Sequence, residues 1–350
     1  MKFKQLALLT LISMSHASLA QENARLAELL QTIDTSTCGH LAVAWMEGGQ
    51  SGSIILSKDN GVTVSSLYEI GSITKGLTGI ALARAVLNDQ VSLSDDVYSL
   101  LPFKDKKLEY LRGVTLEDLA THTSGLPRIP SMGVLYALRH RNNPYAPIDE
   151  AVLKTALTKT KLWNQGEANY SNLGFGLLGY LVAKASRQTY ADMLEQAVLE
   201  PLGMNASKVH YASVEGTDLA PAFTATCKAG YRWTFQEPTA AAGAVKSNLH
   251  DMRLLLAALL EPEQTTLADA IALATEPRRP FDDATHTGFG WLTQTVRGET
   301  VLWHNGGTGS FASFIGVNKA RGWGVVVLFN KPMHDAVTQA GLSYLTNASE

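Results

Sequence analysis

The feature that most restricts the fold of this chain is the position of its strand-like segments, which stand near the two ends of the sequence. Two runs near the N-terminus flank a Gly48-Gly49 turn signal, and three more lie near the C-terminus. The interval between them has mostly helical or loop character. The sequence therefore predicts an α/β (α+β) fold whose single sheet is built from both chain ends. The predicted strands are Leu41–Glu47, Gly52–Ser57, Val301–His304, Phe311–Val317 and Gly324–Phe329.

Apolar residues at helical spacing mark the rest of the chain. We expect a single domain over residues 21–350, with a mostly helical insert at about 81–285. A capping box at Thr115–Asp118 predicts a short helix inside that insert. The other expected helices are Glu22–Ile33, Ile73–Leu87, Ile148–Leu157, Gly174–Ala185, Asp251–Leu260 and Asp335–Leu345.

The first twenty residues read as a targeting segment. Lys2 and Lys4 precede an apolar run from Leu6 to Ile12, and Ser18-Leu19-Ala20 resembles a signal-peptidase site. We therefore predict a signal peptide over residues 1–20, a periplasmic or secreted protein, and no membrane span after its removal. An uncleaved membrane anchor is the alternative, although the apolar run is short for a spanning helix.

Composition narrows the possible partners and cofactors. The formal net charge is −3 over 350 residues, without a basic stripe, so nucleic acid is not an expected partner. The nine histidines form no H-x-x-H or H-E-x-x-H arrangement, so we expect no metal and no cofactor. Cys38 and Cys227 form no C-x-x-C pair, and both a disulfide and two free thiols remain open.

Ser72-Ile73-Thr74-Lys75 is the motif that carries chemistry. Positions i and i+3 share a helix face, so the Lys75 amine can reach the Ser72 hydroxyl. A serine is a weak nucleophile until a base takes its proton, and burial can lower a lysine pKa enough for the amine to serve as that base. Alone, the tetrad is also compatible with an ordinary helix cap and an exposed lysine.

Two further segments qualify as site candidates. Tyr170-Ser171-Asn172 precedes a helix, where Tyr170 could transfer protons and Asn172 could hold a substrate amide. His304-Asn305-Gly306-Gly307 ends a strand, where glycines leave room for substrate and a backbone N–H could join that of Ser72 as an oxyanion hole. Read singly, the first segment can be a capped turn and the second a glycine-rich hairpin.

Taken together, these motifs resemble those of the penicillin-recognising serine hydrolases. This family comprises class C β-lactamases, D-alanyl-D-alanine peptidases and related esterases. The segments Tyr68–Lys75, Leu119–Pro127 and Pro201–Met204 look like family stretches, and the order of S-x-x-K, Y-S-N and H-x-G matches as well. The resemblance covers essentially the whole chain after the targeting segment.

The resemblance implies an antiparallel sheet flanked by helices beside an all-helical subdomain. It also implies that Ser72 is acylated and that Lys75 and Tyr170 share the proton transfers. Asn172, His304, Asn305 and Gly306 would bind substrate, and the N–H groups of Ser72 and Gly307 would form the oxyanion hole. The expected reaction is cleavage of an amide bond in a β-lactam or a D-alanyl-D-alanine-type peptide.

One position departs from the class C pattern, where lysine generally stands in place of His304. Histidine is charged only near or below a pKa of about 6.5, which disfavours efficient β-lactam hydrolysis. Arg128 or Arg297 could supply the missing charge, although either can be a solvated surface residue. A carboxylesterase and a slow-turnover penicillin-binding sensor remain alternatives.

Two other patterns point away from different enzyme classes. The run Gly174–Gly179 fits G-x-G-x-x-G but lies inside a helical pattern, so we interpret it as a helix-packing surface rather than a nucleotide site. The sequence lacks a G-x-S-x-G elbow, which argues against an α/β-hydrolase.

Overall fold

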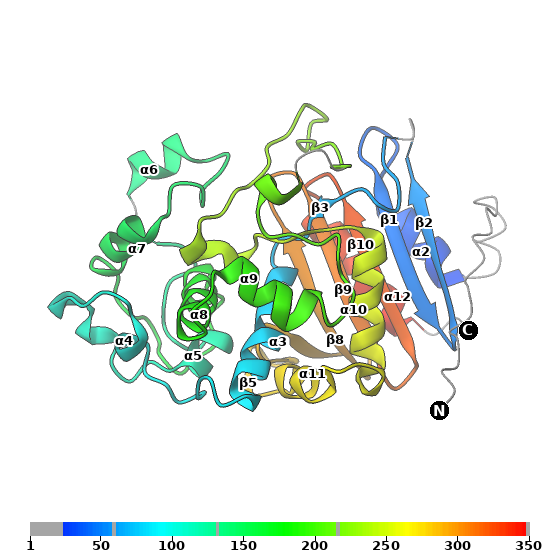
Figure 1. The fold of residues 1–350 in the computed structure, drawn as a ribbon. Helices are drawn as coiled ribbons and strands as arrows, with labels where there is room; N and C mark the ends of the chain where they lie inside the picture. Colours follow the sequence, from blue (N-terminus) through cyan, green and yellow to red (C-terminus); the bar gives the residue numbers. More distant parts are fainter. Residues whose placement is uncertain (1–23, 58–60, 131–132, 215–217, 348–350) are drawn as a thin grey trace.

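The centre of the structure, a computed structural model that describes residues 24–57, 61–130, 133–214 and 218–347, is an eight-stranded antiparallel sheet. Its strand order is β2-β1-β10-β9-β8-β7-β6-β5 (Figure 1). The predicted signal peptide lies outside the described residues. The strands are β1 (Leu41–Glu47), β2 (Gln50–Leu56), β5 (Arg279–Pro280), β6 (Thr285–Thr287), β7 (Leu292–Val296), β8 (Glu299–Gly307), β9 (Ala312–Asn318) and β10 (Trp323–Phe329).

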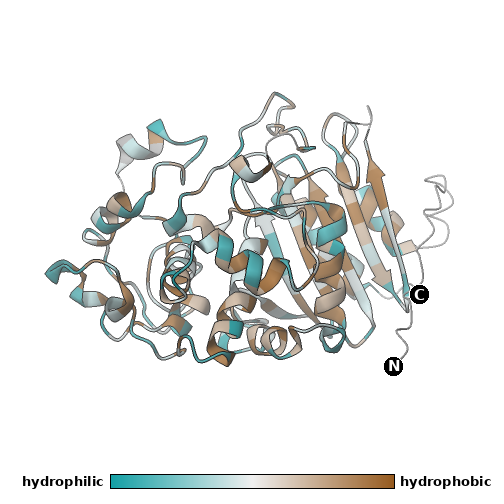
Figure 2. Ribbon diagram, in the orientation of Figure 1, coloured by the Kyte–Doolittle hydropathy of each residue, from teal (hydrophilic) through white to brown (hydrophobic). Residues whose placement is uncertain are grey.

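The sheet joins the two ends of the chain, as the sequence predicted. β1 pairs antiparallel with β10, and Leu41 stands opposite Phe329. Side chains alternate between the two faces of each strand. Leu41 and Val43 pack with α2 (Ala24–Thr32) and α12 (His334–Thr346), whereas Ala42 belongs to the larger core on the opposite face. The apolar strands therefore lie between two layers of helices (Figure 2).

The helix layer on the larger core places the site. It contains α3 (Ile73–Leu87), α10 (Leu249–Leu260) and α11 (Ala268–Thr275), and the all-helical region lies beside it (Figure 1). That region contains α4 (Val97–Leu100), η1 (Lys106–Leu111), α5 (Leu116–Ala120), α6 (Val134–Arg139), α7 (Glu150–Leu157), α8 (Asn172–Ala185), α9 (Tyr190–Leu194) and η2 (Glu195–Leu199). The other short helices are η3 (Tyr211–Val214), η4 (Glu237–Ala242) and η5 (Pro262–Gln264). No helix in the described part of the chain is long and apolar enough to cross a membrane.

Two parts of the sheet structure differ from the sequence expectation. β5, β6 and β7 extend the sheet beyond β8, and β5 begins before residue 285, where the helical insert was expected to end. In addition, β3 (Tyr68–Glu69) pairs with β4 (Lys246–Ser247) in a separate two-stranded ribbon. These strands are two to five residues long, too short to give a clear alternation of apolar and polar residues.

The glycines of α8 pack that helix closely against η4, as the sequence predicted. A Cβ on Gly176 would lie 2.8 Å from the Pro238 carbonyl oxygen, and one on Gly179 would lie 2.3 Å from the Ala241 side chain. Only hydrogen atoms at these positions allow such an approach. The packing fixes η4, whose last residue, Ala242, contributes a carbonyl to the site described below.

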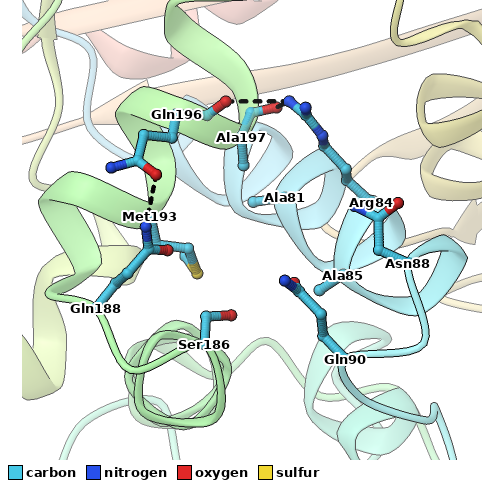
Figure 3. Close-up of a pocket in the computed structure, with 10 residues that line it drawn as sticks. All are labelled: Ala81, Arg84, Ala85, Asn88, Gln90, Ser186, Gln188, Met193, Gln196 and Ala197. Atoms are coloured by element: carbon cyan, nitrogen blue, oxygen red, sulfur yellow. Dashed lines mark hydrogen bonds between the residues drawn. The ribbon is translucent and has the colours of Figure 1, made fainter.

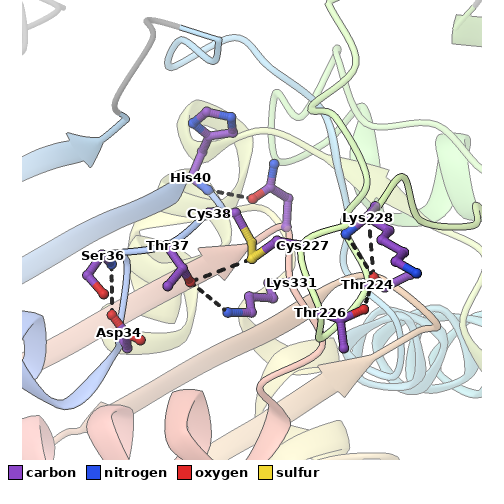
Figure 4. Close-up of a disulfide and its surroundings, with 11 residues drawn as sticks. Asp34, Ser36, Thr37, Cys38, His40, Thr224, Thr226, Cys227, Lys228 and Lys331 are labelled. Atoms are coloured by element: carbon purple, nitrogen blue, oxygen red, sulfur yellow. Dashed lines mark hydrogen bonds between the residues drawn. A yellow bond between two sulfur atoms is a disulfide. The ribbon is translucent and has the colours of Figure 1, made fainter.

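A disulfide joins Cys38, just before β1, to Cys227 in the loop that precedes η4 (Figure 4). The two cysteines are 189 positions apart in the sequence, and their Cα atoms are 5.8 Å apart. Tyr231 follows in the same loop, and its backbone N–H donates to Ser310 Oγ at 2.9 Å. The covalent bond therefore anchors a loop that packs next to the end of β8.

We expect removal of this disulfide to lower the stability of the fold. A Cys38→Ser, Cys227→Ser protein should lose about 2–5 kcal/mol of unfolding free energy, because the unfolded chain regains the freedom of a long closed loop. Urea unfolding followed by tryptophan fluorescence measures the loss. The wild-type protein unfolded in reductant is the matched control, and an unchanged midpoint in both would contradict the prediction.

Candidate active site

Ser72 lies at the junction between β3 and α3. The turn at this junction requires glycine at position 71, directly before Ser72. Gly71 has a φ of 51°, and a Cβ there would lie 2.5 Å from the Gly307 backbone nitrogen. Ser72 is the N-cap residue of α3, yet its side chain makes no capping hydrogen bond. The hydroxyl therefore remains available for other partners, and the end of β8 passes directly beside it.

Gly306 and Ser313 hold this junction against the sheet. Ser313 Oγ on β9 donates to the Ile70 carbonyl at 2.8 Å. A Cβ on Gly306 would lie only 1.9 Å from that same carbonyl oxygen. Gly306 thus has a packing role, because the absence of a side chain allows the Ile70 backbone to contact β8 closely.

Lys75 lies one helical turn from Ser72 and is completely buried. Its Nζ is 3.1 Å from Ser72 Oγ and 2.6 Å from the Ala242 carbonyl oxygen. The Tyr170 ring centroid is 4.9 Å from the same nitrogen. The spacing predicted from the sequence is therefore realised, and the alternative of an exposed lysine is ruled out.

Burial is the main reason that the pKa of Lys75 lies well below its ordinary value, and the positive charge of Arg128 lowers it further. A neutral amine carries a lone pair that can accept a proton from Ser72 while one of its N–H groups still donates to Ala242. The environment of Lys75 therefore suits a general base.

Tyr170 approaches Ser72 from the all-helical region. Its phenol forms a hydrogen bond with the Ser72 side chain, and this bond lowers the pKa of Tyr170. Burial has the larger effect, so the pKa of Tyr170 is raised overall. The phenol consequently keeps its proton at neutral pH. The pKa of Lys75 is thus lowered and that of Tyr170 is raised. This difference suits Lys75 to act as a base and Tyr170 to act as a proton donor.

His122 fixes the backbone on both sides of Tyr170. Its carbonyl accepts the Asn169 N–H at 2.8 Å, and its Nδ1 accepts the Ser171 N–H at 3.1 Å. The two rings of His122 and Tyr170 have centroids 4.5 Å apart. Burial, followed by the charge of Lys75, lowers the pKa of His122 well below its usual value, so the imidazole stays neutral and Nδ1 can accept. Sequence reasoning gave this residue no role, although it lies in the family-like stretch Leu119–Pro127.

We expect loss of the Nδ1 acceptor to displace Tyr170. His122→Ala should lower kcat by about tenfold to a hundredfold and change KM little, because a shift of about 1 Å in a catalytic group has effects of that size. His122 has a φ of 63°, which asparagine tolerates. His122→Asn keeps a side-chain acceptor and is the control that should retain more activity. Equal kcat values for the two variants would exclude this positioning role.

His304 lies on the face of β8 that is directed toward the site, and its side chain is buried. Its ring centroid is 6.4 Å from that of Tyr170. Burial, together with the nearby charge of Lys75, lowers its pKa to about 3. The imidazole is therefore neutral at physiological pH, so the position offers substrate a polar ring and no positive charge.

The two candidate asparagines have different surroundings. Asn172 Nδ2 donates to the Tyr145 hydroxyl at 2.7 Å, and its buried Oδ1 has no hydrogen-bond partner among the described residues. Since a hydroxyl both donates and accepts, either end of this amide can be presented to substrate. Asn305 instead donates to Thr338 Oγ1 at 2.9 Å on α12, across the sheet from Ser72. The side chain of Asn305 is thus not placed to bind substrate as expected.

Of the two candidate arginines, one likewise lies at the site and the other does not. The Arg128 guanidinium carbon lies 5.1 Å from the Tyr170 ring centroid, and the side chain is exposed. Arg297 lies in the turn between β7 and β8 and donates to Asn347 near the C-terminus. That turn is at the end of β8 opposite to Gly307. Only Arg128 therefore belongs to the site.

Other features of the described residues contribute no second site of this kind. No group of His, Cys, Asp and Glu side chains among them could hold a metal ion. A polar hollow between the C-terminal half of α3 and the segment 186–197 is lined by Arg84, Asn88, Gln90 and Gln188, among others (Figure 3). Ser72 lies at the opposite end of α3, so this hollow is separate from the site.

An antiparallel sheet built from both chain ends, with a buried lysine beside a serine at the start of α3, is the arrangement of the β-lactamase fold. The Beta-lactamase family model matches residues 41–346, and the chain belongs to this family. This family belongs to the serine hydrolase superfamily that includes class C β-lactamases and D-alanyl-D-alanine carboxypeptidases.

Individual relatives are distant in sequence. Protein flp of Staphylococcus aureus (strain N315) is 25% identical over 316 residues, which cover 83% of this chain and 60% of that protein. Unguisins hydrolase ungD' of Aspergillus campestris is 25% identical over 342 residues, which cover 91% of this chain and 61% of that protein. The chain thus spans about three fifths of the length of these relatives.

Proposed function

We propose that this protein is an exported serine hydrolase that forms an acyl-enzyme on Ser72 and cleaves an amide bond of a D-alanyl-D-alanine-type peptide or a β-lactam. The observation that carries the proposal is the 3.1 Å contact between Lys75 Nζ and Ser72 Oγ, in surroundings that lower the lysine pKa. A serine with a neutral amine at this distance has the base that it needs to act as a nucleophile.

In the first half of the proposed reaction, the Ser72 proton passes to Lys75 Nζ as Oγ attacks the substrate carbonyl carbon. The carbonyl oxygen becomes an oxyanion between the N–H groups of Ser72 and Gly307, whose backbone lies against Gly71. Tyr170 then gives its proton to the leaving nitrogen and recovers one from Lys75. The amide C–N bond breaks, and the acyl group remains on Ser72.

In the second half, water attacks the acyl carbon, and the same groups take its proton and return one to Ser72 Oγ. The product acid leaves, and every proton is restored. In this proposal Asn172 holds the substrate amide. Its contact with Tyr145 and its Oδ1, which has no partner in the described structure, support this role. Gly306 acts indirectly in this proposal, because its missing side chain admits the Ile70 carbonyl and so holds the backbone before Ser72 against β8.

The proposal has two further supports. A relative named as an unguisins hydrolase is consistent with hydrolysis as the reaction type. The proposed export rests on the charged and apolar N-terminal pattern of residues 1–20.

The test is intact-protein mass spectrometry after mixing the purified protein with benzylpenicillin, followed over time with the concentration of the drug. A persistent adduct with the drug spared supports a peptidase or a penicillin-binding sensor. Turnover of a D-alanyl-D-alanine peptide then supports the peptidase. Rapid loss of the drug with a short-lived adduct supports a β-lactamase.

A carboxylesterase is the second candidate, and the neutral His304 favours it. A site without a cation at that position suits an uncharged ester. Hydrolysis of short acyl esters, with neither a penicillin adduct nor loss of the drug, would support the esterase and exclude the amide-cleaving function.

A further inference from the structure

Arg128 places a permanent positive charge beside Tyr170, and the proposed reaction does not use it. Arg128 is exposed, and its guanidinium lies over the Tyr170 ring, with the carbon 5.1 Å from the ring centroid. Within the described part of the chain, no carboxylate forms an ion pair with it. An arginine over a catalytic tyrosine and without an acidic partner has its donors available to a ligand.

The backbone of Arg128 is held in place while its side chain reaches the solvent. Its carbonyl accepts the N–H groups of Asn172 and Leu173, at 3.0 Å and 3.3 Å, at the start of α8. The same helix start carries the Asn172 amide that is placed to hold substrate. The Arg128 backbone is therefore fixed relative to Asn172, which together with Tyr170 is proposed above to contact substrate from the all-helical region.

The electrostatic surroundings show that the guanidinium lies near the reacting groups. Its charge adds to the larger effect of burial in lowering the pKa of Lys75 and of His122, and it opposes the burial that raises the pKa of Tyr170. His304, which stands where class C β-lactamases generally have lysine, is neutral. The permanent positive charge beside Tyr170 is thus on Arg128, and His304 on β8 adds none.

We propose that Arg128 binds a carboxylate of the substrate beside Tyr170, and that this selects anionic over neutral substrates. This inference rests on the proposed acyl-enzyme function. It adds the residue that replaces the missing lysine and predicts a charged substrate. An arginine suits this role because its planar guanidinium can donate two parallel hydrogen bonds to a carboxylate.

The test compares two matched pairs of compounds that differ in one negative charge. The first pair is benzylpenicillin and its methyl ester, and the second is a D-alanyl-D-alanine peptide and its C-terminal amide. Acylation rates, or kcat/KM where the compounds turn over, are measured for wild type, Arg128→Gln, Arg128→Lys and Arg297→Gln. The last variant is the control, since Arg297 is a surface arginine outside the site.

The informative quantity is the ratio of the rate for the anionic compound to that for the neutral one. Loss of Arg128 also raises the pKa of Lys75, but this affects both members of a pair equally and leaves the ratio unchanged. We expect Arg128→Gln to lower the ratio about tenfold to a hundredfold, as for loss of a charged hydrogen bond. The ratio for Arg128→Lys should lie between those of wild type and Arg128→Gln, and the ratio for Arg297→Gln should equal that of wild type. An unchanged ratio for Arg128→Gln would overturn the proposal.

Binding without reaction separates this inference from the proposed function. Calorimetry with the Ser72→Ala protein measures the affinity for benzylpenicillin and for its methyl ester, with and without Arg128→Gln. Selective loss of affinity for the acid supports the carboxylate site even if no acylation is ever seen. Equal loss for both compounds, no loss, or no binding of either would exclude it. Absence of acylation in the wild-type protein counts against the proposed function alone.

Discussion

The Ser72→Ala protein will form no covalent adduct with benzylpenicillin, and its hydrolytic rate will fall by about 10⁴-fold or more. Removal of the nucleophile from a set of groups that act together costs about as much as removal of the whole set. Because the Ser72 side chain makes no capping bond at the start of α3, the substitution should leave the helix and the unfolding midpoint nearly unchanged. Intact mass after incubation and the rate of substrate loss are the measurements.

The control for this experiment is Ser99→Ala, which removes an exposed serine of α4 far along the sequence from the site. This variant should acylate like wild type. An adduct of normal yield on the Ser72→Ala protein would mean that another side chain is the nucleophile, and the proposed function would then be wrong.

The second large effect is expected at Lys75. Lys75→Met keeps an unbranched chain in the buried space but removes the amine, so acylation should slow by about 10³-fold or more. Lys75→Arg retains a cation whose pKa is too high for a base, and it should be nearly as slow. Stopped-flow measurement of acylation tests both variants, with circular dichroism to verify folding. Acylation of Lys75→Met at the wild-type rate would exclude the lysine as base.

The pH dependence of acylation follows from the same lysine. Its amine accepts a proton only when deprotonated, so the rate should rise with pH through the Lys75 pKa and then level off. Burial and Arg128 lower that pKa, which moves the rise to lower pH than an ordinary lysine would give. Arg128→Gln should move the rise back to higher pH. His304, with a pKa of about 3, should add no step between pH 5 and 8.

The sequence predicted the parts of this fold that have a long repeating pattern or a fixed spacing. The helix Ile73–Leu87 and the strand Leu41–Glu47 have the predicted bounds, because long apolar periods mark both. The Ser72–Lys75 pair was predictable because one helical turn determines the distance between the two side chains. The family-like motifs supplied Tyr170, which no local spacing connects to Ser72.

Other features depend on contacts between distant segments, which a single sequence does not encode visibly. The Cys38–Cys227 bond was left open because nothing local brings positions 189 residues apart together. The alternation of side chains along a strand would have placed Asn305 on the opposite face from His304. That inference needed a strand that continues to Gly307, whereas the predicted strand ended at His304. The hydrogen bonds from the backbone around Tyr170 to His122 could not be predicted, because they depend on the relative position of two separate loops. The choice between Arg128 and Arg297 required the position of the turn between β7 and β8.

The pairing of β1 with β10 has a consequence for how the chain acquires its structure. β1 precedes most of the described residues, yet its partner β10 is the last strand among them. Such distant pairing makes folding slow, because the entropy of a very long loop must be lost before the contact forms. The hairpin of β1 and β2 alone is too small to be stable in water. The β1 edge of the sheet therefore stays without its β10 partner until the strands that follow the helical region have been synthesised.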